Sequence, residues 1–124
     1  MQQTILIIDT TQVILELMEL ILTDAGYQVI TAEQALPLSQ ITSLSPDLVI
    51  IEDWLHGHSC LGSEICKAIK SLPSAKNIPA LLMSTLPDLS VTANNAQADG
   101  IIPKPFNIDE LVSLVSKVLR GPAI

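Results

Sequence analysis

Short apolar runs alternate with segments of helical periodicity along the whole chain. The runs that predict strands are bounded by polar or turn-forming residues and occupy residues 4–8, 28–31, 48–51, 78–83 and 100–102. Unbroken apolar runs of this length are typical of parallel strands that are covered on both faces. The most apolar of them follows Pro46-Asp47 and leads into Glu52-Asp53.

Apolar residues at helical spacing predict a helix after each of the first three strands. The first begins with Thr10 or Thr11 as N-cap, stops at Gly26, and carries Val13, Ile14, Leu17, Met18, Ile21 and Leu22. A weak helix is expected within residues 32–44, interrupted early by Pro37. A third, ended by Pro73, carries Ile65, Cys66, Ile69 and Leu72.

The sequence predicts one of the two remaining helices much more clearly than the other. Residues 87–98 have little apolar periodicity, so that helix should be short or irregular. Asn107 and Glu110 form a capping box for the last helix, which should bury Ile108, Leu111, Leu114, Val115, Val118 and Leu119. Five strands alternating with helices predict one α/β domain with an open, doubly wound parallel sheet.

Composition supports one covered sheet and narrows the function. The 124 residues fit a single domain, and 48% hydrophobic against 15% charged residues indicates extensive burial. A net charge of −7 disfavours nucleic acid and anionic membranes as partners, and aromatics at 2% offer few stacking platforms for flavin or bases. No apolar run approaches the roughly 20 residues of a membrane span, so we expect a cytoplasmic location.

Polar side chains follow four of the predicted strands at the point where each strand ends. They are Asp9, Thr10, Glu52, Asp53, Ser84, Thr85 and Lys104. In an open parallel sheet the carboxyl ends of the strands meet at one edge, where ligands bind. These residues are therefore the candidate site.

The order and spacing of these residues resemble the receiver (CheY-like) domains of two-component response regulators over the whole chain. The phosphate-accepting aspartate of that family lies six residues after a proline, and counting from Pro46 reaches Glu52. Ser84 matches the hydroxyl residue, and Lys104-Pro105-Phe106 matches a motif whose Lys-Pro bond is often cis. The resemblance implies a flavodoxin-like (βα)5 fold with strand order 2-1-3-4-5.

The site departs from the family pattern in ways that weaken its chemistry. Thr10 replaces the second of two adjacent acids that hold Mg²⁺, and His56-Gly57 stands where Pro-Gly is usual. Ile101 replaces the aromatic switch residue. Mg²⁺ requires several oxygen ligands, so a metal site built on Asp9 and Glu52 should be weak, and we expect no other cofactor.

Glu52 is one methylene longer than aspartate, and a displacement of about 1 Å can cost about 10²-fold in rate. We hypothesise that Glu52 pairs with Lys104 and holds the domain in one state without phosphorylation. The alternative is that both are solvated charges that contribute little. Asp53 is the rival acceptor, because a one-residue bulge would turn it inward; otherwise strand alternation turns it away from Glu52.

The loop after the third strand offers two further candidates. His56, His58 and Cys60 could bind Zn²⁺, although an exposed polar loop explains the same residues more simply. Trp54 could anchor a partner or be half-buried packing. Cys66 lies at core spacing, and both thiols should be reduced.

These features predict a receiver domain over residues 1–120 with a C-terminal tail at 121–124. We expect a protein-interaction module and not an enzyme, with a histidine kinase, an effector or another signalling protein as partner, and a homodimer as a further arrangement. Ile101, Phe106 and the last helix are the expected contact surface. The alternatives are a working phosphoacceptor that uses Asp53 or Glu52 with Mg²⁺, and a flavodoxin-like cofactor binder. The chain ends soon after the last helix, so no effector domain is expected within it.

Overall fold

The computed structural model describes residues 2–53, 62–84 and 94–120. The described strands are β1 (Thr4–Ile8), β2 (Gln28–Ala32), β3 (Leu48–Glu52), β4 (Ala80–Ser84) and β5 (Gly100–Pro103). The helices are α1 (Gln12–Asp24), α2 (Leu38–Leu44), α3 (Gly62–Ser71) and α5 (Ile108–Arg120). Each predicted strand is present, with its ends within two residues of the prediction.

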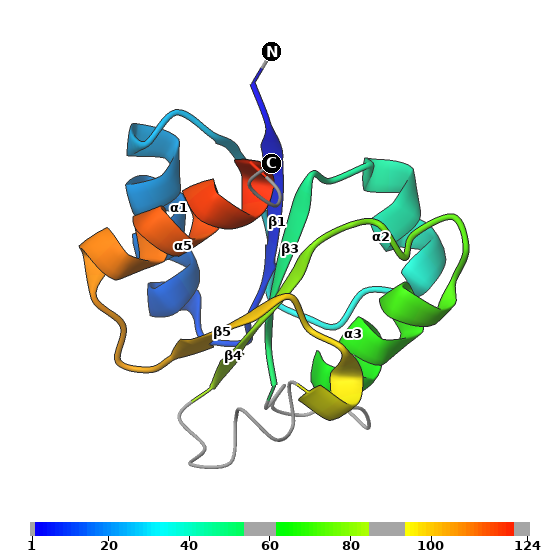
Figure 1. Cartoon of the computed structure of the whole chain (residues 1–124). Coiled ribbons are helices and arrows are strands. Elements are labelled where there is room, and N and C mark those ends of the chain that lie inside the picture. The colour runs from blue at the N-terminus through cyan, green and yellow to red at the C-terminus, as the bar shows by residue number, and fades with distance from the viewer. Residues whose placement is uncertain (1, 54–61, 85–93, 121–124) are drawn as a thin grey trace.

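The strands form one parallel sheet in the order β2-β1-β3-β4-β5 among the described residues. Helices α1 and α5 cover one face, and α2 and α3 cover the other (Figure 1). The predicted doubly wound α/β architecture and strand order are therefore confirmed. Every strand runs in the same direction, so their carboxyl ends share one edge of the sheet.

Period-two alternation along the strands divides the core into two layers. In β1, Ile5 and Ile7 pack towards α1 and α5, while Leu6 and Ile8 pack towards α2 and α3. The central strands β3 and β4 are buried along their whole length. This explains why these strands read as continuous apolar runs, because both faces must be apolar.

The buried face of α1 differs from the predicted one. Val13 and Leu17 were expected at core spacing, but they are 70% and 40% exposed. Leu15, which that prediction omitted, is buried with Met18 and Leu22. The prediction failed because α1 is apolar on most of its circumference, so several faces satisfy the same spacing and only contact with the sheet selects one.

The ends of the helices follow local signals. Pro37 precedes α2 at the N-cap position, and its fixed φ starts the helix there and not at residue 32. Gly26, with φ of 104°, reverses the chain between α1 and β2, where a side chain would be strained. Thr11 is the N-cap of α1, but its side chain makes no capping hydrogen bond.

The N-terminus of α5 is capped as predicted by Asn107, whose Oδ1 accepts a hydrogen bond from the Glu110 backbone N–H at 3.1 Å. Leu111 and Val115 are the buried residues of this helix. Ile108 was predicted to be buried and is 53% exposed, because it lines an open groove between the first turn of α5 and the end of α1. Leu114, Val118 and Leu119 pack partly buried against the core.

Two expectations fall partly or wholly outside the described residues. Of the segment predicted as a short helix, residues 94–98 are described, and 94–96 of them are helical. The tail at 121–124 lies outside the described residues. Among the helices that the structure describes, none is long and apolar enough to cross a membrane.

The observed orientation of α1 predicts that replacing leucine by alanine lowers the free energy of unfolding much more at a buried position than at an exposed one. Leu15→Ala removes a side chain that is 2% exposed and should lower the free energy of unfolding by about 2–5 kcal/mol. Leu20→Ala, at a position that is 69% exposed, is the matched control and should change it by less than about 0.5 kcal/mol. Urea denaturation of both variants measures the difference, and equal losses would contradict the observed orientation of α1.

Candidate functional site

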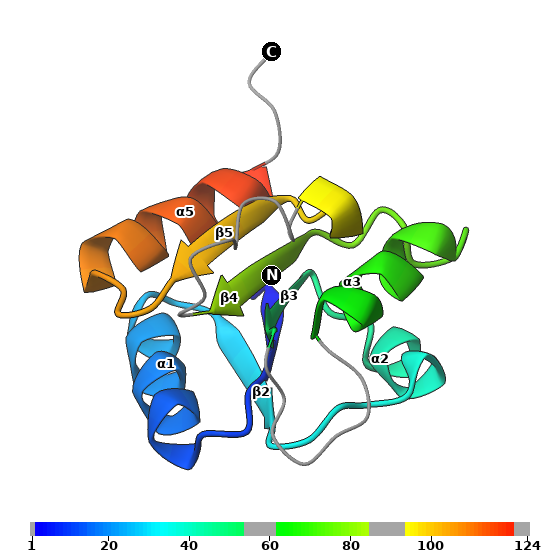
Figure 2. The same ribbon diagram turned by 90° about the horizontal axis from the view of Figure 1, so that it is seen from below.

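Four of the predicted site residues converge at the carboxyl ends of the strands, the edge seen in Figure 2. Asp9 follows β1, Glu52 ends β3 and Ser84 ends β4, while Lys104 follows β5. Asp9, Glu52 and Ser84 are buried. They meet because parallel pairing aligns the ends of strands that are far apart in the sequence.

Lys104 joins two buried carboxylates. Its Nζ lies 2.6 Å from Glu52 Oε2 and 2.9 Å from Asp9 Oδ2. The Lys104 side chain is only 13% exposed, so these are charge-assisted contacts shielded from solvent. The predicted pairing of Glu52 with Lys104 is present, and the alternative of two solvated charges is wrong.

The carboxylates raise the pKa of Lys104 above its ordinary value of 10.5. Burial alone would lower that pKa, because it disfavours the charged ammonium. Hydrogen bonds to Glu52 and Asp9 outweigh burial, since both carboxylates stabilise the protonated form. Lys104 is therefore held as a fixed cation between strands β1, β3 and β5.

Asp9 also organises the chain that leaves β1. Its Oδ1 accepts a hydrogen bond from the Thr11 backbone N–H at 2.8 Å, so one oxygen supports the start of α1 and the other binds Lys104. Thr10 lies beside it in place of a second acid, and its buried Oγ1 has no hydrogen-bond partner among the described residues. Thr10 therefore adds no charge to the site.

Asp53 points away from this ion pair. Residues Val49 to Glu52 pair one to one with β4 without a bulge, and the Asp53 N–H continues the ladder to Met83 O at 2.8 Å. The Asp53 carboxylate accepts a hydrogen bond from the Ser63 backbone N–H at 3.0 Å. Asp53 therefore caps the N-terminus of α3, where a negative charge is favourable.

Gly62 is a positioning residue that the sequence analysis did not identify. Its N–H donates to Asp53 O at 2.8 Å, and a Cβ at this position would overlap the backbone carbonyl oxygen of Glu52. Close approach of two backbones is a recognised use of glycine. The available signal was a glycine at the start of a helix, directly after the loop that follows β3.

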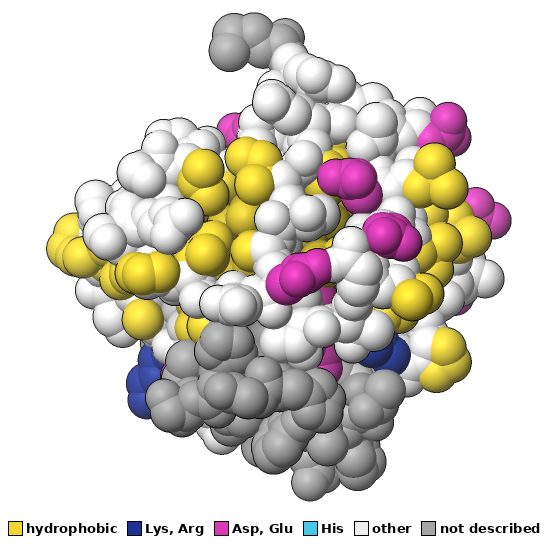
Figure 3. All heavy atoms as spheres, turned by 180° about the vertical axis from the view of Figure 1, so that it is seen from behind, with side chains coloured by type: hydrophobic (Ala, Val, Ile, Leu, Met, Phe, Trp, Pro, Cys, Tyr) yellow, Lys and Arg dark blue, Asp and Glu magenta, His cyan; other side chains and the backbone are white. Residues whose placement is uncertain are grey.

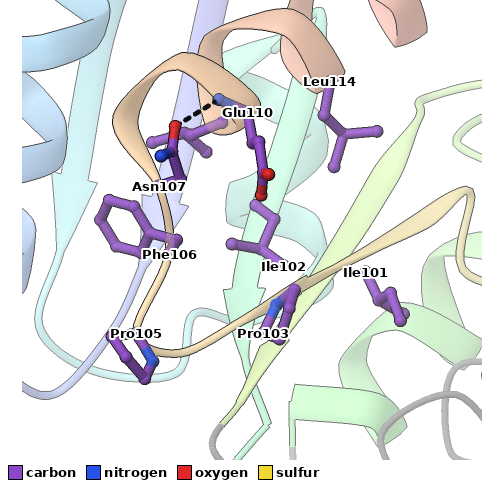
Figure 4. Close-up of a pocket in the computed structure, with 9 residues that line it drawn as sticks. Ile101, Ile102, Pro103, Pro105, Phe106, Asn107, Glu110 and Leu114 are labelled. Carbon is purple, nitrogen blue, oxygen red and sulfur yellow. Dashed lines mark hydrogen bonds between the residues drawn. The ribbon is translucent and has the colours of Figure 1, made fainter.

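The segment after Lys104 forms a second feature beside the site. The Lys104–Pro105 peptide bond is cis, and the Lys104 N–H donates to Ser84 O at 3.0 Å. Ile101 packs on the buried Leu82, as does Ala98. Between β5 and the start of α5 lies a pocket of about 240 Å³, in which the Glu110 side chain extends from α5 towards Ile102 of β5 (Figure 4).

Several predicted site residues lie outside the described residues, namely Thr85, Trp54, His56, Gly57, His58 and Cys60. Cys66 is a free, buried thiol, and burial raises its pKa to about 11, as expected for an inert core cysteine. Within residues 2–53, 62–84 and 94–120, no group of three or more His, Cys, Asp or Glu could hold a metal ion.

Comparison with known proteins identifies relatives of the whole chain. A family model described as response regulator receiver domain matches residues 5–116. The chain is 32% identical to the phosphate regulon transcriptional regulatory protein PhoB of Pseudomonas aeruginosa, covering 97% of this chain and 54% of that protein. It is 33% identical to the nitrogen assimilation regulatory protein NtrX of Azorhizobium caulinodans, covering 97% of this chain and 27% of that protein.

A solved structure shares the fold closely. The crystal structure of a Chloroflexus aurantiacus J-10-fl protein described as a response regulator superposes with a TM-score of 0.87. The two chains are 33% identical over 97% of this chain and 99% of that one. The likeness in fold therefore spans nearly the whole of both chains.

Replacing Lys104 tests whether the ion pair is structural. Lys104→Met leaves Asp9 and Glu52 buried without their cation and should lower the free energy of unfolding by about 3–5 kcal/mol at neutral pH. Lys67→Met, at an exposed position on α3, is the control and should change it by less than about 0.5 kcal/mol. Urea denaturation measures both, and a Lys104 variant as stable as the control would show that the ion pair contributes nothing.

The raised pKa of Lys104 also predicts a pH dependence. The folded state holds this proton more tightly than the unfolded state, so the stabilisation is fully present below the ordinary value of 10.5. It should be lost as pH rises through the raised pKa of the folded protein. Above neutral pH, the stability gap between the natural chain and Lys104→Met should therefore narrow only in strong alkali, as followed by urea unfolding at a series of pH values from neutral upwards. A gap that narrows between neutral pH and 10.5 would be the contrary result.

Proposed function

The chain belongs to the response regulator receiver family of two-component signalling, and from this membership we propose that its phosphorylation site is degenerate and that it works as a protein-interaction module. Receiver domains are signalling modules, so the flavodoxin-like cofactor binder is set aside. One observation above all supports a degenerate phosphorylation site: Lys104 bridges Asp9 and Glu52.

The acceptor position is charge-paired before any phosphoryl group arrives. Glu52 Oε2 contacts the lysine that would otherwise neutralise an incoming phosphoryl oxygen. The carboxylate that would attack the phosphoryl group and the lysine that would stabilise its charge are therefore bound to each other. An acceptor in this state should be a poor nucleophile, because the same ion pair must break before its carboxylate can attack.

The donor set does not fit Mg²⁺, the metal that the family implies. One Asp9 oxygen binds Lys104 and the other binds the Thr11 N–H, while Glu52 Oε2 binds Lys104. Thr10 supplies a hydroxyl in place of an anionic oxygen. Mg²⁺ dehydrates reluctantly and requires near-octahedral oxygen ligands, so we derive no step through it and propose no resident cofactor.

Glu52 is preferred to Asp53 as the occupant of the acceptor position. The reason is direction: Glu52 faces Lys104, whereas the Asp53 carboxylate is engaged with the Ser63 N–H at the start of α3. Phosphorylation of Asp53 would require it to give up that cap. The charged group would also have to cross to the opposite face of β3.

The proposed contact surface comprises β5 and the start of α5. The pocket there is lined by Ile101, Phe106 and Leu114, with Glu110 on its α5 wall (Figure 4). Ile101, at the position of the aromatic switch, is packed on Leu82 and gives this surface one apolar wall. A small apolar hollow with one carboxylate suits a side chain of a protein partner.

The relatives of this chain are longer proteins, in which the matching region is one part. The chain spans about half of the PhoB relative and about a quarter of the NtrX relative. Receiver domains of this family act with histidine kinases and effector domains. We propose a signalling protein of that kind as partner, no enzymatic activity of its own, a cytoplasmic site of action, and no direct binding to nucleic acid or membrane, in keeping with the net charge of −7.

Incubation with acetyl phosphate and Mg²⁺, followed by intact mass measurement, tests the degenerate site. The natural chain should remain unmodified, because the acceptor is paired with Lys104 and the metal ligands are too few. The double variant Thr10→Asp/Glu52→Asp restores both acids and should gain one phosphoryl group. This variant is the positive control: its modification would show that acetyl phosphate is active and that the fold can accept a phosphoryl group.

Peptide mapping assigns any modification that is found. A stable acyl phosphate on Glu52 of the natural chain would refute the proposal. Modification that Asp53→Asn abolishes would instead establish the rival acceptor, and Asp53→Asn should otherwise change only stability, through loss of charge at the α3 cap.

A further inference from the structure

One ammonium group serves both buried carboxylates at the carboxyl ends of the strands. Asp9 is 0% exposed and Glu52 is 7% exposed, and each contacts the Nζ atom of Lys104. Two negative charges and one positive charge leave these three groups with a net charge of −1. Because they are shielded from solvent, the position favours a cation strongly.

The contacts of Lys104 engage the oxygens that a divalent cation would need. Its Nζ lies 2.6 Å from Glu52 Oε2 and 2.9 Å from Asp9 Oδ2, while Asp9 Oδ1 accepts a hydrogen bond from the Thr11 N–H at 2.8 Å. A divalent cation bound to the same two oxygens would have to enter the space that the ammonium fills. Two positive charges at such close range repel one another, so the ammonium and the metal are alternatives.

The distances around Lys104 Nζ fit a large divalent cation better than a small one. Ca²⁺ binds oxygen at about 2.3–2.6 Å in flexible geometry, whereas Mg²⁺ requires about 2.0–2.1 Å and a near-ideal octahedron. With oxygens at 2.6 and 2.9 Å, Ca²⁺ in place of the ammonium would need the smaller movement of the two carboxylates. Thr10, next to Asp9 in the chain, has a buried hydroxyl oxygen without a partner among the described residues.

We infer that Lys104 is the internal counter-ion of this site and that it keeps divalent cations away from Asp9 and Glu52. The tethered ammonium prevails in the natural chain, because it reaches the carboxylates without the loss of freedom that binding a separate ion entails. The natural chain is therefore indifferent to Mg²⁺ and Ca²⁺. Removal of the charge at residue 104 opens a site that takes Ca²⁺ in preference to Mg²⁺.

This inference rests on the proposed function and deepens it, because it names the group that excludes the metal. The missing acid at Thr10 lowers the number of ligands, but it leaves two carboxylates that could still hold an ion of suitable size. Lys104 engages both of them. The lysine, and not only the missing acid, therefore makes the site independent of metal.

Calcium titration of variants at residue 104 tests the exclusion, with binding measured by isothermal titration calorimetry at neutral pH. Lys104→Met removes the charge and should bind Ca²⁺ about 10- to 100-fold more tightly than the natural chain does. The same variant should bind Mg²⁺ more weakly than Ca²⁺. Lys104→Arg retains a cation and should bind Ca²⁺ no better than the natural chain.

Two further variants locate the binding. Exposed carboxylates, such as those seen from behind in Figure 3, provide weak cation binding elsewhere on the surface. Lys67→Met makes the same change of net charge at an exposed position on α3 and should leave Ca²⁺ binding unchanged. Lys104→Met/Asp9→Asn removes one of the two carboxylates and should lose the gain in affinity that Lys104→Met provides.

Thermal unfolding gives a second readout, because an ion that binds the folded state raises the thermal midpoint. Replacing EDTA by millimolar Ca²⁺ should raise the midpoint of Lys104→Met and leave that of the natural chain unchanged. If Lys104→Met is unfolded in EDTA, Ca²⁺ should restore its far-ultraviolet circular dichroism. Refolding by Ca²⁺ would then be the supporting result.

Four results would overturn the inference: a natural chain that binds Ca²⁺ as tightly as Lys104→Met; an equal gain in Lys67→Met; a Lys104→Met variant that Ca²⁺ neither binds nor refolds; or a preference of that variant for Mg²⁺. The acetyl phosphate experiment on the natural chain has a separate outcome. Failure of the calcium titration leaves the degenerate site standing, whereas an acyl phosphate on Glu52 refutes the proposed function whatever the titration shows.

Discussion

The ion pair of Lys104 with two buried carboxylates is the constraint around which the site is built. Three strand ends must lie within contact distance for one ammonium to reach Asp9 and Glu52, at 2.9 and 2.6 Å. Each charge on its own would be costly to bury, and together they compensate one another. The pair thus links β1, β3 and β5 at the edge where a receiver carries out its chemistry. It also occupies the groups that this chemistry would need.

The backbone around the pair restricts what its neighbours can do. Gly62 packs against the Glu52 carbonyl, and Asp53 is turned by strand alternation to cap α3. Adjacent carboxylates in the sequence therefore have unrelated roles, one in the ion pair and one at a helix terminus. Asp9, Glu52 and Lys104 together carry a net charge of −1, and in the proposed function this ion pair holds the domain in one state without phosphorylation.

The outer surface carries the features that remain available for partners. Helix α5 has an apolar pocket on its β5 side and an apolar groove on its α1 side, and both are bordered by acids. Apolar area supplies most of the affinity at such surfaces, and charge selects the partner. Neither surface includes Glu52 or Lys104, so the partner contacts proposed for this molecule do not require a phosphorylated site.

The sequence by itself determined the order of the elements, the parallel sheet and the identity of the residues at the strand ends. These follow from local signals: unbroken apolar runs, caps such as Asn107, and the spacing from Pro46 to Glu52 and on to Lys104. Tertiary structure alone decided which face of α1 is buried, that Ile108 is exposed, and in which directions the Glu52 and Asp53 side chains point. Helical spacing cannot choose between two apolar faces of one helix, and a carboxylate takes its role from the groups brought near it by strand pairing.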